Sequence, residues 1–175
     1  MLKIAHKNTE GINRQEFEAI FDQYYDKLKN FLFYRCGNTE LAEDIVQDVF
    51  IKLWEYREKV KKDTVQSLLY SIANNLFNND FNRKKVRLNF VNTIIEDNRN
   101  NESPEYLAEL KEFDVYLQNT LNDMPEKSRT VFLMNRIDEM TYKDIASSLD
   151  ISVKAVEKRM SKALAYFSDK IGKKV

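Results

Sequence analysis

The chain has 175 residues, of which 28 are basic and 28 acidic, so its formal net charge is zero. Neutrality is unusual for a protein that holds DNA unaided by neutralising phosphates, so any DNA binding has to be local. A single cysteine, Cys36, and a single histidine, His6, exclude an internal disulfide and a multi-residue Cys/His metal site.

The composition favours a helical protein without catalytic chemistry. Three glycines and two prolines leave few helix breakers, and 43% apolar residues suffice for folded cores. There is no glycine-rich phosphate loop and no plausible nucleophile–histidine pair, so we expect neither an enzyme nor a cofactor. Because no apolar run has the length of a membrane span and the N-terminus lacks an apolar signal segment, we expect a cytoplasmic protein without membrane insertion.

The first helix is predicted to begin near Asn13. Residues 1–12 include a stretch without periodicity and are predicted to be a flexible tail. Asn13 and Glu16 have the spacing of a capping pair. The apolar stripe that follows predicts a core-facing helix, with Gly37 as its stop, and comprises Phe17, Ile20, Phe21, Tyr24, Leu28, Phe31 and Leu32.

The second helix, over residues 42–54, combines an apolar face with a compact acidic one. Its apolar residues recur at intervals of three and four, which predicts one buried face, and Thr39 can cap the helix. The opposite side carries two carboxylates, an amide and an uncovered aliphatic: Asp44, Gln47, Asp48 and Ile51. This patch could dock a partner, or it could be the solvated face of an ordinary core helix.

A third helix, capped by Asp63 or Thr64, carries many asparagines although Asn is a poor helix former. Side-chain amides hydrogen-bond base edges well. The polar residues that form this candidate DNA surface are Asn74, Asn75, Asn78, Asn79, Asn82, Arg83 and Lys84. The alternative is a compositional bias followed by a solvated basic helix end.

A change of composition divides the chain into two helical bundles. The polar segment 90–103 reads as a flexible linker between an N-terminal domain, 13–89, and a C-terminal domain, 104–175. Ser103 and Pro104 form a strong helix start. We therefore predict an all-α protein of two small bundles.

The C-terminal bundle is predicted to contain a helix-turn-helix. Met124-Pro125 opens one helix, Thr141 caps a short one, and after a turn at Asp150 the longer last helix follows Ser152. In such a motif the second helix enters the major groove, with its N-terminal residues nearest the bases. The outward residues of that helix are Ser152, Lys154, Ala155, Lys158, Arg159 and Lys162.

Three of these segments, in this order, resemble the extracytoplasmic-function sigma factors of the sigma-70 family. Ala42-Glu43-Asp44 with Gln47, Phe50 and Trp54 is similar to the family's signature helix. Ile72-Ala73-Asn74-Asn75 is similar to the family's Ile-Ala-Arg-Asn element, and residues 124–164 are similar to its minus-thirty-five reader. The resemblance implies that the acidic patch binds the clamp helices of core RNA polymerase. It also implies that Asn75 captures a flipped minus-ten base. Departures at Leu68, Asn74 and Asn82 leave the minus-ten base preference open.

Two functions of different classes remain open at this stage. In the first, the chain is a dissociable polymerase subunit with core RNA polymerase and promoter DNA as partners, and an anti-sigma factor is a further candidate. In the second, it is a stand-alone helix-turn-helix regulator with an N-terminal sensing or dimerising bundle. The acidic patch together with the Asn-rich basic helix favours the first, because a sensor needs neither. We expect a monomer when the protein is free.

Overall fold

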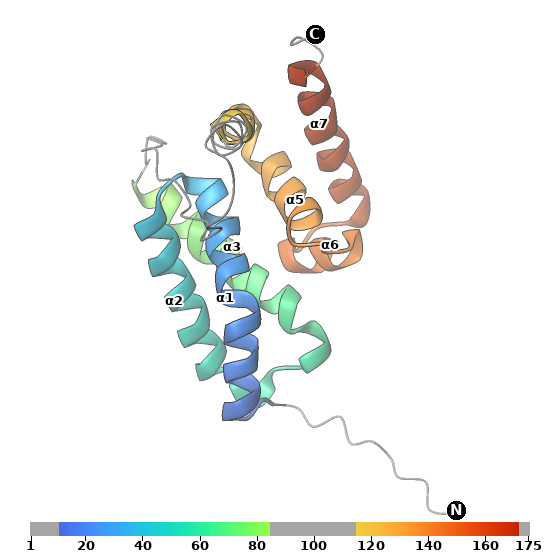
Figure 1. The fold of residues 1–175 in the computed structure, drawn as a ribbon. Coiled ribbons are helices and arrows are strands. Elements are labelled where there is room, and N and C mark those ends of the chain that lie inside the picture. Colours follow the sequence, from blue (N-terminus) through green and yellow to red (C-terminus); the bar gives the residue numbers. More distant parts are fainter. Residues whose placement is uncertain (1–10, 85–114, 172–175) are drawn as a thin grey trace, which may run out of the picture.

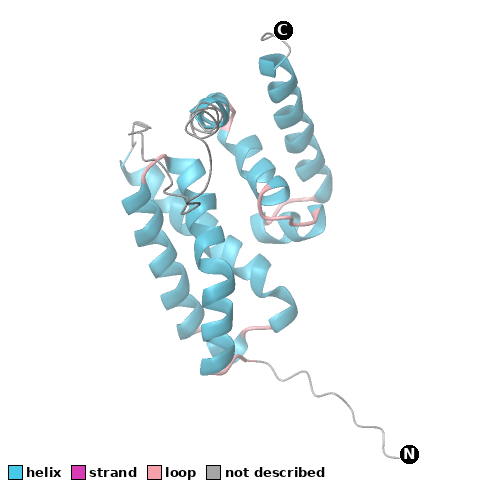
Figure 2. Cartoon of the chain, viewed as in Figure 1, coloured by secondary structure: helices cyan, strands magenta, loops and turns pink. Residues whose placement is uncertain are grey.

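The structure is a computed structural model that describes residues 11–84 and 115–171. All regular structure within these ranges is helical (Figures 1 and 2), so the predicted all-α class is confirmed. Residues 115–123 are helical. The remaining elements are α1 (Arg14–Cys36), α2 (Thr39–Glu55), η1 (Arg57–Lys59), η2 (Lys62–Thr64), α3 (Val65–Lys84), α5 (Glu126–Arg136), α6 (Tyr142–Leu149) and α7 (Val153–Ile171).

The predicted linker 90–103 and the domain boundaries at residues 89 and 104 lie outside the described residues, as does most of the predicted tail. The two described residues of that tail, Gly11 and Ile12, make backbone hydrogen bonds. The amide of Gly11 donates to the Val60 carbonyl at 2.9 Å, and that of Ile12 donates to the Arg57 carbonyl at 2.8 Å. The Ile12 side chain is buried, so apolar contact holds the chain two residues before the helix begins.

Both ends of α1 follow the local signals in the sequence. The Asn13 side chain accepts from the Glu16 amide at 3.0 Å, and the Glu16 carboxylate accepts from the Asn13 amide at 2.9 Å, which completes the capping box. At the other end Gly37 has φ 65°, a left-handed conformation that glycine adopts without strain, and its amide bonds the Phe33 carbonyl.

The cap of α2 is Asn38, and the prediction of Thr39 is wrong. The Asn38 side chain accepts from the Leu41 amide at 2.9 Å, whereas Thr39 is already helical. Gly37 turns the chain sharply enough that Asn38 has extended backbone, as a capping residue needs. The two helices therefore follow each other with only Gly37 and Asn38 between them.

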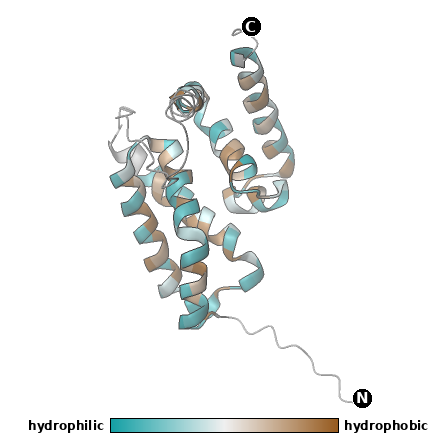
Figure 3. Ribbon diagram, viewed as in Figure 1, coloured by the Kyte–Doolittle hydropathy of each residue, from teal (hydrophilic) through white to brown (hydrophobic). Residues whose placement is uncertain are grey.

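In the N-terminal bundle α1, α2 and α3 pack against one another (Figure 1). Apolar stripes run along the facing sides of these helices, visible as brown bands in Figure 3. Their fully buried side chains include Leu28, Leu32, Val46, Val49 and Leu53. Burial of each such side chain is worth about 1.5–3 kcal/mol, so the three-four spacing fixes which face of each helix turns inward.

In the C-terminal bundle α6 and α7 form the predicted helix-turn-helix, with α5 packed against both. The Thr141 hydroxyl accepts from the Asp144 amide at 3.2 Å and caps α6. Asp150 makes the turn with φ 51°, the left-handed conformation that Asp tolerates better than most residues. The Ala155 amide donates to the Ser152 hydroxyl at 3.2 Å, so Ser152 caps α7 as predicted.

Two large apolar side chains of the C-terminal bundle, Leu164 and Ile137, are exposed. The inward stripe of α7 passes through Met160, Ala163 and Phe167, which leaves Leu164 turned away, with 42% exposure. Ile137 is 41% exposed because α5 ends at Arg136 and the chain changes direction there. The Phe132 and Phe167 rings stack with centroids 4.6 Å apart and close the contact between α5 and α7.

Candidate nucleic-acid and partner interfaces

The outer face of α2 carries the acidic patch as predicted. Asp44, Gln47, Asp48 and Ile51 are all exposed, and Ile51 keeps 56% of its surface. On the opposite side Ile45, Val46, Val49, Phe50 and Leu53 are buried. The patch is therefore rigidly backed by the core, while its own side chains are available to a partner.

An aromatic edge extends this acidic patch. Trp54 is 38% exposed and Tyr56 60% exposed. The Trp54 ring meets Phe17 edge-on, with centroids 5.0 Å apart, and the Arg57 guanidinium lies 4.6 Å from its centroid. Exposed aromatics beside a charged patch are typical of binding surfaces.

The asparagines of α3, predicted to form one surface, differ in their exposure. Asn75 and Asn79 are exposed. Asn74 and Asn78 are half-buried, and both side-chain carbonyls accept hydrogen bonds from Arg35, at 3.1 and 3.4 Å. The side chains of Asn82, Arg83 and Lys84, at the end of α3, lie outside the described residues.

Arg35, which the sequence analysis did not single out, lies at the contact between the two bundles. Its guanidinium is fully buried, with the Phe77 ring centroid at 4.0 Å and that of Phe31 at 5.3 Å. Besides the two asparagines it bonds the Glu126 carboxylate at the start of α5. A signal existed: Arg35 continues the inward stripe of Leu28, Phe31 and Leu32, where a charge needs a buried partner.

The charges of this contact persist at neutral pH. Burial lowers the pKa of the Arg35 guanidinium, and the Glu126 carboxylate opposes that shift. Burial raises the pKa of the Glu126 carboxyl, but Arg35 and the Thr130 hydroxyl outweigh it and leave this pKa below its ordinary value. Arg129, also buried, lies close enough to affect both partners. Two arginines thus share one carboxylate.

A second contact between the bundles surrounds Asp138. The Gln66 side chain on α3 donates to the Asp138 backbone carbonyl at 3.4 Å. Burial raises the pKa of the Asp138 carboxyl to about 7, against the opposing influence of the Tyr70 hydroxyl and Lys27. Neither carboxylate oxygen has a hydrogen bond of ordinary geometry among the described residues.

The first turns of α7 present the predicted basic surface. Ser152, Lys154, Lys158 and Lys162 are exposed, whereas Ala155 and Arg159 are half-buried. The three lysines are spaced by four residues, so they lie along one side of the helix. A row of flexible ammonium groups of this kind suits the phosphates of duplex DNA.

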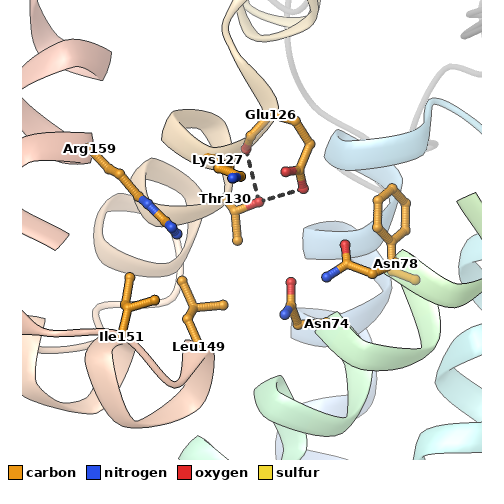
Figure 4. A pocket seen from close by; sticks show the side chains of 9 residues that line it. Asn74, Asn78, Glu126, Lys127, Thr130, Leu149, Ile151 and Arg159 are labelled. Carbon is orange, nitrogen blue, oxygen red and sulfur yellow. Dashed lines mark hydrogen bonds between the residues drawn. The ribbon is translucent and has the colours of Figure 1, made fainter. Parts of the chain in front are cut away.

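The two predicted DNA surfaces meet in one pocket of about 450 Å³. In Figure 4, Asn74 and Asn78 lie on one side of the pocket, and Arg159, Leu149 and Ile151 lie on the other. The pocket is lined by Asn74, Phe77, Asn78, Glu126, Lys127, Thr130, Leu149, Ile151 and Arg159. The structure thus brings together residues that were assigned to separate DNA elements.

Two negative findings apply to residues 11–84 and 115–171. No group of three or more His, Cys, Asp or Glu side chains there could hold a metal ion. No helix in these ranges is both long and apolar enough to cross a membrane.

Comparison with known families matches both bundles. Residues 20–87 match sigma-70 region 2, and residues 114–166 match sigma-70 region 4. The two matches together cover more than half of the chain, in the order predicted from sequence.

Characterised relatives support the same assignment. SigW, an ECF RNA polymerase sigma factor of Bacillus subtilis, is 28% identical over 173 residues, covering 91% of each chain. YlaC, an RNA polymerase sigma factor of the same organism, is 25% identical, covering 86% of this chain and 89% of its own. The ferric citrate uptake sigma factor FecI of Escherichia coli is 25% identical, covering 86% of this chain and 87% of its own.

Two solved structures share the fold. Bartonella quintana RpoE, solved in complex with the anti-sigma factor NepR, gives a TM-score of 0.72 at 17% identity, covering 90% of this chain and 98% of its own. CnrH, solved with the cytosolic domain of CnrY, gives 0.69 at 23% identity, covering 93% and 92%.

The chain therefore belongs to the sigma-70 family, as an RNA polymerase sigma factor of the extracytoplasmic-function (ECF) type. It directs promoter-specific initiation of transcription together with core RNA polymerase. The alternative of a stand-alone regulator is set aside, because the N-terminal bundle of this chain matches sigma-70 region 2.

Proposed function

We propose that this sigma factor divides initiation among three surfaces, defined as follows. The clamp face of α2 comprises Asp44, Gln47, Asp48 and Ile51, and it docks core polymerase. The minus-ten face comprises Asn74, Asn75, Asn78, Asn79, Asn82, Arg83 and Lys84, and it binds the melted strand. The minus-thirty-five face comprises Ser152, Lys154, Ala155, Lys158, Arg159 and Lys162, and it binds duplex DNA. Domain limits of 13–89 and 104–175 belong to the same proposal.

The clamp face gives the proposal its strongest support, because its four side chains are all exposed on a helix whose other side is buried in the core. A carboxylate pair with an adjacent amide and aliphatic offers charge, hydrogen bonds and apolar contact in one patch. The exposed Trp54 ring extends the same surface with an aromatic anchor.

Among the minus-ten asparagines whose side chains the structure describes, Asn75 and Asn79 are exposed. An amide both donates to and accepts from a base edge without carrying charge, which suits recognition of an extruded base. Opening the duplex costs a few kcal/mol per unstacked base, and such contacts have to offset that cost.

On the minus-thirty-five face, the lysine row of α7 supplies phosphate contacts, and the capped start of the helix brings Ser152 and Ala155 nearest the bases. Because the net charge of the whole chain is zero, this row alone gives weak binding. The free protein should bind promoters poorly, and core polymerase should supply the rest of the affinity.

We place this action in the cytoplasm, where polymerase acts. The solved complexes of B. quintana RpoE with NepR and of CnrH with CnrY also make an anti-sigma factor a candidate partner for this chain. Such a partner would compete with core polymerase for the clamp face, or it would cover the pocket between the bundles.

Gel shifts of promoter DNA with and without core polymerase test the proposal. Specific shifts that require both the protein and the core enzyme are the expected result. Tight, sequence-specific shifts by the protein alone would contradict the proposal, because the C-terminal bundle would then suffice for specific promoter binding.

A further inference from the structure

The pocket beside α3, α5 and α7 has the size and lining of a small-molecule site (Figure 4). Its volume of about 450 Å³ falls within the usual range for ligand pockets, roughly 300–1,000 Å³. In the view of Figure 4 the apolar side chains of Leu149 and Ile151 lie below the cationic side chains of Lys127 and Arg159. A pocket with separate apolar and charged parts suits an organic ligand that carries a charged head group.

Hydrogen-bond donors dominate the polar lining of this pocket. The side-chain carbonyls of Asn74 and Asn78 accept from Arg35, so the two amide nitrogens remain as donors for a ligand. Lys127 on α5 and Arg159 on α7 add an ammonium and a guanidinium. Neither of these two cations forms an ion pair with another described residue. The groups that are left to bind a ligand are therefore mainly donors, and two of them are charged.

The charge of the pocket wall favours an anion. Glu126 contributes the one carboxylate of the lining, and it is already bonded to the fully buried Arg35. Buried Arg129 lies close enough to interact with the same carboxylate. The Glu126 charge is thus balanced from within the protein, whereas Lys127 and Arg159 have no such partner. Cations that line a concave site attract anions more strongly than the same charges on an open surface.

The first turns of α5 strengthen this preference. Glu126, Lys127 and Thr130 of this 11-residue helix line the pocket. The residue that precedes the helix, Pro125, makes no side-chain hydrogen bond to the first amides. The positive end of the helix dipole adds to the field of the two cations.

We propose that this pocket binds a nucleoside monophosphate. The phosphate would bond the Lys127 ammonium and the Arg159 guanidinium, whose two charges match the ≈ −1.5 to −2 charge of a phosphate monoester at pH 7. A guanidinium binds phosphate oxygens in a bidentate way, which adds geometric specificity. The inference goes beyond the proposed function and does not depend on it, because it concerns a free small molecule and not promoter DNA.

The remaining lining suits a base better than a bare sugar. The Leu149 and Ile151 side chains offer apolar contact to the face of a flat ring, whereas a ligand rich in hydroxyl groups would leave those groups without partners there. The amides of Asn74 and Asn78 can bond the edge of a base, since amide groups match its donors and acceptors.

Calorimetric titration of the full chain with AMP, GMP, CMP and UMP, each by itself, tests the proposal. At least one of the four should bind with one molecule per chain. It should bind about tenfold more tightly than inorganic phosphate or its own nucleoside, because each of these probes lacks a part whose loss costs at least one hydrogen bond to a charged group or the apolar contact.

Two variants locate the binding site. Lys127→Ala removes one cation, and Asn78→Asp keeps an oxygen for Arg35 but replaces the donor nitrogen with a charged oxygen. Each should weaken nucleotide binding about tenfold, the usual effect of losing a hydrogen bond to a charged group. Lys143→Ala, at an exposed lysine of α6 outside the pocket lining, is the matched control and should bind as the wild type does. Circular dichroism should show the same helix content in all three variants.

Three results would overturn the proposal. The first is no binding of any of the four nucleotides, including the case in which a single-stranded DNA 12-mer binds in the same buffer. The second is nucleotide binding that Lys127→Ala and Asn78→Asp both leave unchanged, which would place the ligand elsewhere. The third is inorganic phosphate that binds as tightly as every nucleotide, which would leave no role for the apolar part of the pocket.

Discussion

The Arg35 guanidinium on α1 and the Glu126 carboxylate at the start of α5, 91 residues apart in the chain, form an ion pair in which the arginine is fully buried. The same guanidinium bonds Asn74 and Asn78 and lies over the Phe77 ring. One side chain therefore links the core of the N-terminal bundle, the proposed minus-ten helix and the C-terminal bundle. Any change at Arg35 or Glu126 should affect all three together.

Substitutions on the clamp face should reduce polymerase binding and leave the fold intact. Asp48→Lys should reduce binding to core polymerase at least about tenfold, because a reversed charge opposes a complementary surface at a cost of several kcal/mol. Since Asp48 is exposed, stability should change by less than about 0.5 kcal/mol. Core pull-down and thermal melting measure the two effects. Asp63→Lys, the same change in the exposed η2 turn, is the control, and equal loss of binding by both variants would contradict the assignment.

The lysine row of α7 should act through phosphates. Lys158→Ala should weaken promoter binding by the holoenzyme on all sequences alike. It should also reduce the slope of log affinity against log salt by roughly one unit for each phosphate that the protein no longer neutralises. Titrations at several salt concentrations measure this slope. Lys143→Ala, an exposed lysine of α6, should leave the slope unchanged, and a change of sequence preference in Lys158→Ala would instead assign base contacts to this residue.

Asn75 should act after recruitment. Asn75→Ala removes amide hydrogen bonds to an extruded base, so this variant should form closed complexes normally and open them poorly. Permanganate footprinting measures the opening, and a template with a pre-melted bubble should restore most of the missing transcription. Asn119→Ala, an exposed asparagine of the C-terminal bundle, is the control. Normal opening by Asn75→Ala would show that the melting role belongs to other residues.

Stability should fall as pH rises from about 4 to about 7. Because the pKa of buried Asp138 is raised to about 7, the folded chain holds a proton there that the unfolded chain has released. The free energy of unfolding should therefore decrease by at most about 1.4 kcal/mol per pH unit across this window. The contribution is complete below the ordinary carboxyl pKa and is lost as pH passes about 7.

Urea unfolding of the wild type and of Asp138→Asn between pH 5 and 8 measures this effect. The asparagine variant should lack that slope, because it carries no titrating proton, and should be the more stable of the two at pH 8. An identical pH dependence in both proteins would show that the slope comes from other groups.

The sequence predicted the features that local chemistry decides. The inward face of α2 follows from apolar spacing, and the Asn13, Thr141 and Ser152 caps follow from side chains that satisfy free amides. The cap at Asn38 lies one residue before the predicted Thr39, because the left-handed Gly37 is followed by an extended Asn38, the backbone conformation that a capping residue needs.

Contacts between distant segments could not be predicted in this way. Nothing local to Arg35 identifies Glu126 as its partner, and nothing local to Gln66 identifies Asp138. For the same reason the five asparagines of α3 formed one group in the sequence, whereas the structure separates the exposed Asn75 from the bonded Asn74. Leu164 shows that an apolar residue on an amphipathic helix is not always covered.

The most direct test of the central claim is transcription by core RNA polymerase on fragmented genomic DNA from the source organism, with and without the protein, followed by sequencing of the RNA 5′ ends. The account predicts new start sites that appear only with the protein and share one pair of minus-ten and minus-thirty-five elements at a fixed spacing. An identical set of start sites with and without the protein would contradict it.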